Sequence, residues 1–134
     1  MKREAVNPDS LYKSVQYGFS HAIKSNGKVS IHCAGQVAWD KDHNVIGQGD
    51  VGTQARQALS NLKEVLAAVG ASPADVVRTR TFVVNYKPDY LDPLGQAFAE
   101  FYGNVTPAAG TLIGVQSLAL PDFLIEIEAT AQTD

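Results

Sequence analysis

The chain has 134 residues, of which 45% are hydrophobic, and a formal charge of −3 at neutral pH. This length fits one domain with its own core, so we expect a single domain over residues 1–134. A weakly acidic chain lacks the positive field that attracts nucleic acid, and no apolar run approaches the roughly 20 residues of a membrane-spanning helix. We therefore expect neither nucleic acid nor a membrane as a partner.

The only cysteine, Cys33, excludes an internal disulfide, and residues 1–8 lack the apolar stretch of a secretory signal. Together these features predict a cytoplasmic protein.

The first predicted elements are two strands that form a hairpin. Residues 28–34 alternate between apolar and polar side chains, which is typical of a strand in a half-buried sheet. Asn26-Gly27 lies just before them and is the strongest short signal for a two-residue hairpin loop. We therefore expect residues 14–24 to be the antiparallel partner of this strand.

Two segments repeat apolar residues with the 3.6-residue period of a helix. The first is bracketed by Asp50, which can cap its N-terminus, and Gly70, which can adopt the left-handed conformation that ends a helix. The second has Asp89 or Asp92 as its candidate cap and Gly103 as its terminator. Each helix carries one apolar stripe, so each should pack against one layer and face water on its other side.

Three further segments, residues 76–85, 111–118 and 124–132, are rich in strand-forming residues. The resulting order β-β-α-β-α-β-β predicts an α+β fold, in which a mixed sheet of about six strands is covered on one face by both helices.

The last strand divides its residues between the two faces of this sheet. One side suits the helices because it is entirely apolar: Ile125, Ile127, Ala129 and Ala131. The other side mixes apolar and acidic residues: Leu124, Glu126, Glu128 and Thr130. Such a mixture is expected where subunits meet and leave wet clefts between them.

The segments Pro107-Ala-Ala-Gly-Thr-Leu-Ile-Gly-Val and Leu124-Ile-Glu-Ile-Glu-Ala resemble the C-terminal signature of the RidA/YjgF family of enamine/imine deaminases. That signature is Pro-Ala-Arg-Ser-x-Val, a spacer, and Ile-Glu-Ile-Glu-Ala. The resemblance covers nearly the whole chain, from Phe19 through Ala34-Gly35-Gln36 to Glu128. It implies a chorismate-mutase-like fold and a homotrimer with a small-molecule cleft at each subunit interface. No nucleotide-binding fingerprint is present, so we expect no cofactor.

The chain departs from the family at the site itself. The arginine that grips the substrate carboxylate in active members falls on Gly110, and the family's tyrosine, serine and asparagine fall on Phe19, Ala34 and near Gly95. An arginine–carboxylate contact contributes about 1.5–3 kcal/mol or more in a desolvated cleft. The resemblance therefore implies a larger, more apolar cleft that suits a less charged ligand.

Glu126 is the residue that the resemblance retains, because the first glutamate of Ile-Glu-Ile-Glu positions the attacking water in the family. The alternative is that Glu126 belongs to a structural ion pair. Arg80 is a candidate replacement for the lost arginine, although an ion pair with Glu126 or Glu128 is favoured. His21 and Thr111, beside two of the changed positions, complete the predicted substrate-binding set.

Two other groups of reactive residues are better explained by structure. His32 and Cys33 are neighbours on a strand, so they point to opposite faces and cannot form a dyad. Asp40-Lys-Asp42-His43 could ligate a metal, but a polar turn needs the same residues, and no metal site is predicted.

The leading hypothesis is thus a RidA-type hydrolase that acts on a C=N or enamine bond with an altered substrate preference. The alternative is a non-catalytic small-molecule-binding or assembly protein of the same fold.

Overall fold

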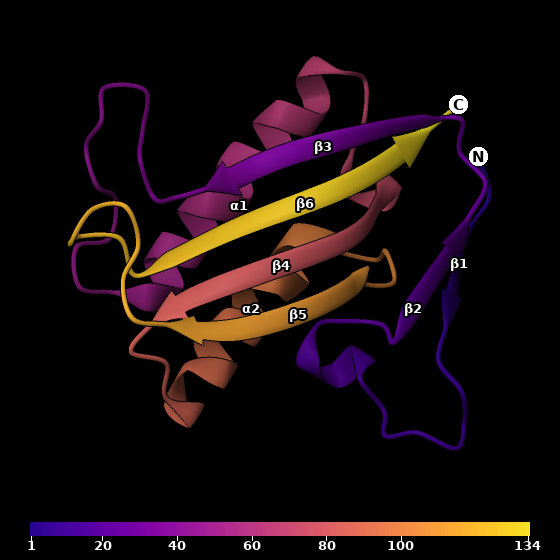
Figure 1. Cartoon of the computed structure of the whole chain (residues 1–134), viewed down its shortest axis with the longest axis horizontal. Coiled ribbons are helices and arrows are strands. Elements are labelled where there is room, and N and C mark those ends of the chain that lie inside the picture. Colours follow the sequence, from indigo (N-terminus) through magenta and orange to yellow (C-terminus); the bar gives the residue numbers. More distant parts are fainter.

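The computed structural model describes all of residues 1–134 (Figure 1). It contains six strands and two α-helices: β1 (Arg3–Val6), β2 (Ala22–Ser25), β3 (Val29–Gln36), α1 (Val51–Ala68), β4 (Val76–Val84), α2 (Leu91–Tyr102), β5 (Ala109–Val115) and β6 (Ile125–Thr133). Short 3-10 turns lie at residues 15–17, 73–75 and 88–90. No helix has the length and apolar character needed to cross a membrane.

The main sheet has four strands in the order β3-β6-β4-β5, and both helices lie behind one of its faces (Figure 1). Strand β6 is antiparallel to both of its neighbours, whereas β4 and β5 run parallel. The predicted α+β fold with a mixed sheet and one helical layer is therefore confirmed. We call the side of the sheet away from the helices the open face.

The six strands do not form one sheet, and the predicted N-terminal hairpin is wrong. Strand β2 pairs with β1, and the two form a separate ribbon. Just before β2, Ser20 makes an isolated β-bridge with Ala109, and Arg3 and Ser25 of the ribbon donate to Val76 and Gln132 of the main sheet. Asn26 extends this ribbon by one residue pair, because the Lys2 N–H donates to Asn26 Oδ1 at 2.7 Å and the Asn26 N–H donates to the Lys2 carbonyl at 3.2 Å. Beyond Gly27 the chain enters β3, which pairs with β6 instead.

The predicted ends of α1 are confirmed. The Thr53 N–H donates to Asp50 Oδ1 at 3.1 Å, and Gly70 follows the helix with φ of +73°. For α2 the terminator Gly103 is confirmed with φ of +58°, but neither Asp89 nor Asp92 is the cap. A 3-10 turn at residues 88–90 leads directly into α2, so the chain is already helical where a capping side chain would otherwise be needed.

The core lies between α1, α2 and the main sheet. The four apolar residues predicted to face the helices from β6 are all buried, whereas Glu126 and Glu128 on the open face are half-buried. Leu124 does not share that open face as expected, since it precedes β6 and packs against the core. Its N–H donates to Oε1 of the buried Gln54 at 2.9 Å, while Gln54 Nε2 donates to the carbonyls of Gly47 and Asp122.

Candidate functional site

Four of the predicted substrate-binding residues, Phe19, Gly95, Gly110 and Thr111, line one pocket of about 170 Å³. The pocket lies between β5, the start of α2 and the loop before β2, and we call it the β5–α2 pocket. Its other walls are mainly apolar or aromatic: Tyr17, Gly18, Thr79, Thr81, Leu91, Leu94, Phe98 and Leu112. The expected apolar character of the cleft is thus present within one subunit.

Gly110 is packed closely against Phe19, so a side chain at this position would press on its neighbours. A Cβ atom on Gly110 would lie 3.0 Å from Phe19 Cβ and 3.2 Å from Thr79 Oγ1. Gly110 is level with Thr79, whose side chain is buried on the helix side of the sheet. A guanidinium at residue 110 would therefore require Phe19 to move.

Its neighbour Ala109 faces the other way. Ala109 is level with Arg78 and shares the open face with it. Counted without a gap from Pro107, the third position of the Pro-Ala-Arg-Ser motif is Ala109, so neither alignment supplies the family's arginine.

Gly95 lies at the mouth of the pocket in a different environment. A Cβ atom there would meet no other atom within 4 Å. The absence of a side chain at Gly95 enlarges the pocket mouth without any steric requirement for glycine.

Glu126 does not lie at this pocket. It is level with Phe82, which is level with Ile113, three residues beyond Gly110 on β5. Three residues along a strand span about 10 Å, and two strand spacings add roughly 10 Å across the sheet. Glu126 also projects from the open face, whereas Gly110 abuts residues of the helix side. One subunit alone therefore does not bring Glu126 and the β5–α2 pocket into one site.

Glu126 instead borders a wide, open cavity of about 640 Å³ near the loop that follows β3. A Cβ atom on Gly35 would lie 2.7 Å from Glu126 Cδ, so glycine is required for this carboxylate to rest against β3. Ala34 is exposed beside it, at an irregularity in the pairing of β3 with β6. Glu126 takes part in none of the ion pairs of the chain.

The walls of this cavity are held by polar and aromatic contacts. Asn61 Nδ2 donates to the carbonyls of Val37 at 3.0 Å and Trp39 at 2.8 Å. The Trp39 ring meets Phe123 edge-on, with centroids 4.9 Å apart. Trp39 is therefore a packing anchor at the wall of this cavity.

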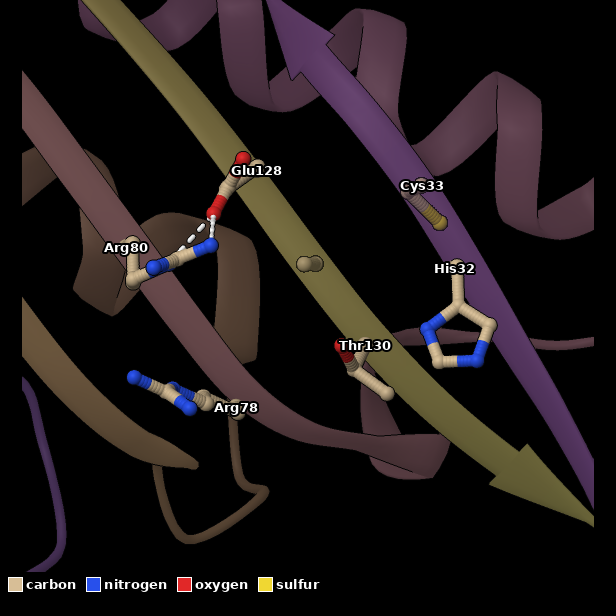
Figure 2. Close-up of a pocket in the computed structure, with 7 residues that line it drawn as sticks. His32, Cys33, Arg78, Arg80, Glu128 and Thr130 are labelled. Carbon is tan, nitrogen blue, oxygen red and sulfur yellow. Dashed lines mark hydrogen bonds and ion pairs between the residues drawn. The ribbon is translucent and has the colours of Figure 1, made fainter.

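Arg80 pairs with Glu128, which lies directly across from it on β6 (Figure 2). The favoured interpretation of Arg80 as an ion-pair partner is confirmed. Arg80 lies on the open face and does not line the β5–α2 pocket. Within one subunit it does not take the place of the missing arginine.

His21 lies next to the pocket but does not line it. Its ring is edge-on to Phe19 at 5.9 Å and to Tyr12 at 4.7 Å, and its Nε2 lies 2.8 Å from the Tyr12 carbonyl oxygen. His21 and Tyr12 thus support Phe19 from outside.

The other reactive groups behave as structural residues. Cys33 is buried in the core, where burial raises the pKa of its thiol, and its neighbour His32 is exposed on the open face. Asp40 accepts hydrogen bonds from the N–H groups of Asn44 and Asp42, each at 2.9 Å, and the bonds from Asn44 lower its pKa. The predicted turn is confirmed, and no group of three or more His, Cys, Asp or Glu side chains is placed to hold a metal ion.

The sequence interpretation missed part of the pocket. Leu94 and Phe98 belong to the buried apolar stripe of α2 and also line the β5–α2 pocket. Thr79 and Thr81 bring the only buried hydroxyls of its wall, from β4. The strand pattern of residues 76–85 gives no indication of a cavity on the helix side.

Comparison with known proteins places this architecture in a family. The sequence profile described as Endoribonuclease L-PSP matches residues 12–133. A RutC family protein of Pyrococcus horikoshii is 36% identical over 114 residues, which cover 84% of this chain and 85% of that protein.

Comparison with solved structures leads to the same family. YyfB of Yersinia pestis, described as a protein of unknown function of the conserved Rid family, is 50% identical with a TM-score of 0.96, covering 98% of this chain and 99% of that one. A putative endoribonuclease of Thermotoga maritima is 25% identical with a TM-score of 0.70, covering 97% of this chain and 92% of that one. The chain therefore belongs to the RidA/YjgF family, the Rid proteins.

Proposed function

We propose that the protein is a small-molecule hydrolase of the enamine/imine deaminase type, active at clefts between the subunits of a homotrimer. The observation that carries the proposal is the position of Glu126, an unpaired carboxylate beside a wide cavity, while the neighbouring Glu128 is engaged by Arg80. A second copy of the chain is needed to bring Glu126 to a β5–α2 pocket. The assembly is tested by light scattering at low micromolar concentration, where a monodisperse monomer would exclude an interfacial site.

The proposed substrate is an imine or enamine without a carboxylate. Phe19 occupies the space beside Gly110, and the pocket walls are largely apolar, so a charged substrate group would lose its hydration without gaining a cation. An apolar substituent would instead be favoured by burial at roughly 25 cal/mol per Å² of apolar surface.

In the proposed reaction, Glu126 orients a water molecule and accepts one of its protons as the oxygen adds to the imine carbon. The imine nitrogen takes up a proton, and the tetrahedral intermediate then expels ammonia as the carbon–nitrogen bond breaks. Imine and water thus give a carbonyl compound and ammonia, with no oxidation or reduction. An enamine enters this sequence by first taking a proton at carbon.

The test is the rate of ammonia release above the uncatalysed rate from two substrates, 2-aminoacrylate and a carboxylate-free ketimine. We expect acceleration with the ketimine and little or none with 2-aminoacrylate. Turnover of 2-aminoacrylate within about tenfold, or 1.4 kcal/mol, of an arginine-bearing family member would contradict the proposed substrate class.

The alternative function is a non-catalytic binding or assembly protein. It is favoured by the loss of the family's polar residues at Phe19, Ala34 and Gly110, which leaves a pocket but fewer reacting groups. Ligand-induced stabilisation by a ketimine analogue without any turnover would support it.

Nuclease activity, which is named in the description of the Thermotoga maritima relative, is disfavoured for this chain, because its net charge of −3 opposes binding to a polyanion. A cytoplasmic location is part of the proposal and rests on Cys33, an unpaired and buried thiol of the kind that persists in reducing compartments.

A further inference from the structure

A further cavity adjoins the β5–α2 pocket on the helix side of the sheet. It has a volume of about 340 Å³ and lies between α2, the 3-10 turn at residues 15–17 and the loop that follows α2. We call it the α2-end cavity, and its walls include Gln16, Ala99, Tyr102, Asn104 and Val105. Helix α2 lies behind the main sheet (Figure 1), so this cavity is not part of the open face.

The two cavities meet at two glycines. Gly18 and Gly95 line both the β5–α2 pocket and the α2-end cavity. A Cβ atom on Gly95 would meet no other atom within 4 Å, so the space at the junction is open. Gly18 has a φ of +89°, a conformation that favours glycine over residues with a side chain. Neither residue places a side chain between the cavities, and together they form one groove, which we call the α2 groove.

The α2 groove follows the helix that gives it its name. Leu91 lines the β5–α2 pocket at the start of α2, and Tyr102 lines the α2-end cavity at the last residue of the helix. Gly95, Ala99 and Tyr102 are spaced by four and three residues, which places them on one face of the helix. From Leu91 to Tyr102 the helix rises roughly 16 Å at 1.5 Å per residue. The groove is therefore elongated along α2.

No charged side chain lines the α2 groove at any point. Its polar side chains, such as Thr79 and Asn104, are all neutral, and the others are aliphatic or aromatic. An ionised group would lose its hydration here without gaining a partner of opposite charge. With about 170 Å³ in one cavity and about 340 Å³ in the other, the groove lies within the range of roughly 300–1,000 Å³ that is typical of ligand pockets.

We propose that the α2 groove binds a linear, uncharged hydrocarbon chain of the substrate. The C=N end would lie in the β5–α2 pocket, and the chain would pass between Gly18 and Gly95 into the α2-end cavity. This inference rests on the proposed hydrolase function and narrows its substrates to imines and enamines of medium-chain aliphatic ketones. A groove that is long and uncharged favours such a chain over a compact or ionised substituent.

The test is isothermal titration of the intact protein with 2-butanone, 2-hexanone and 2-octanone. These ketones are carbonyl products of the proposed reaction, so they bind without turnover. We expect the affinity to rise about fourfold for each added methylene, which corresponds to the roughly 0.8 kcal/mol of burying one CH₂ group.

Ala99→Leu narrows only the α2-end cavity, because Ala99 does not line the β5–α2 pocket. Gly95→Leu fills the junction of the two cavities. Gln96→Leu is the matched control, since Gln96 is exposed on the same helix and lines neither cavity. We expect Ala99→Leu and Gly95→Leu to weaken 2-octanone binding at least tenfold. Ala99→Leu should leave 2-butanone binding unchanged, and Gln96→Leu should leave the binding of both ketones unchanged.

An affinity that does not rise from 2-butanone to 2-octanone would overturn the inference, as would equal weakening by Ala99→Leu and Gln96→Leu. Ammonia release from the ketimine of 2-butanone tests the hydrolase separately, because its short chain does not need the α2-end cavity. Turnover of this ketimine without any dependence of binding on chain length would refute the groove alone. Binding that depends on chain length, without turnover, would support the groove and contradict the hydrolase.

Discussion

On the helix side of the sheet, the β5–α2 pocket is built from apolar and aromatic side chains around Gly110, whereas the open face carries three charged side chains, Arg78, Arg80 and Glu128. Strand β4 contributes residues to both regions. Alternation along β4 accounts for the contrast, because Thr79 and Thr81 turn toward the helices while Arg78 and Arg80 turn away. A single strand thereby supplies two surfaces of opposite character, and Glu126 lies on the charged side.

The largest expected effect comes from Glu126→Gln, which keeps the shape of the side chain but removes its basic oxygen. Turnover of a carboxylate-free imine should fall about 10²-fold or more, within the range of lost general-base catalysis. The assay is ammonia release, with light scattering to show that the assembly is intact.

Glu128→Gln is the matched control, since it lies two residues along the same face and breaks the contact with Arg80 instead. It should retain most of the activity. Equal losses in both variants, or none in either, would remove the functional distinction between the two glutamates and favour the binding-protein alternative.

Gly110→Arg tests whether the apolar β5–α2 pocket can accept a charged side chain. Because Phe19 and Thr79 lie against this position, we expect a loss of about 1–3 kcal/mol of stability from overpacking, and no gain in 2-aminoacrylate turnover. Thermal unfolding measures the loss.

Thr111→Arg is the control for this change, because residue 111 is exposed on the neighbouring position of β5 and should tolerate the larger side chain. Combining Gly110→Arg with Phe19→Ala should recover part of the stability, since the two positions share one space. Additive losses in the double variant would show that Phe19 is not the obstacle.

Gly95→Ala should stabilise the protein by about 1 kcal/mol, because glycine inside a helix is unfavourable and no atom opposes a methyl group here. Its melting temperature should rise, and ligand binding in the β5–α2 pocket should persist. A fall in melting temperature would indicate that α2 needs the flexibility of glycine.

The smallest change in stability is expected from Asp50→Asn, which alters the N-cap of α1 in the helical layer. The hydrogen bonds from Thr53 lower the pKa of Asp50 in the folded protein. A carboxyl group whose pKa is lowered in the folded protein stabilises the fold at pH values above its ordinary pKa. This stabilisation is lost as the pH falls through the folded-state pKa. The difference in melting temperature between the two proteins should therefore shrink on acidification, and a difference that grows would contradict this assignment.

Local patterns predicted the elements well and their pairing less well. Alternation along β6 identified both of its faces, and Asp50 and Gly70 marked the ends of α1. Asn26-Gly27 marked the break between β2 and β3, but a turn motif carries no information about which strands pair. The partner of β2 is β1, twenty residues earlier, and this long-range choice depends on packing that no short motif records.

For the candidate site too, the local residues could be predicted from the sequence, whereas their long-range contacts could not. Phe19, Gly95 and Gly110 were grouped by family resemblance, and the structure places them around one pocket. The resemblance did not reveal that Phe19 fills the space beside Gly110, because that contact joins a loop to a distant strand. Likewise the pairing of Arg80 with Glu128, and not with Glu126, depends on the register of β4 against β6.

The amide of Gln54 links the start of α1 to the backbone on either side of it, at Gly47, Asp122 and Leu124. Because one side chain joins α1 both to the loop before it and to the stretch just before β6, the end of β6 that carries Glu126 should open only together with the first turn of α1. The amide proton of Leu124 should therefore exchange with solvent at the rate of that larger opening. Slow exchange at Leu124 would mean that Glu126 keeps its position between turnovers without any ligand to hold it.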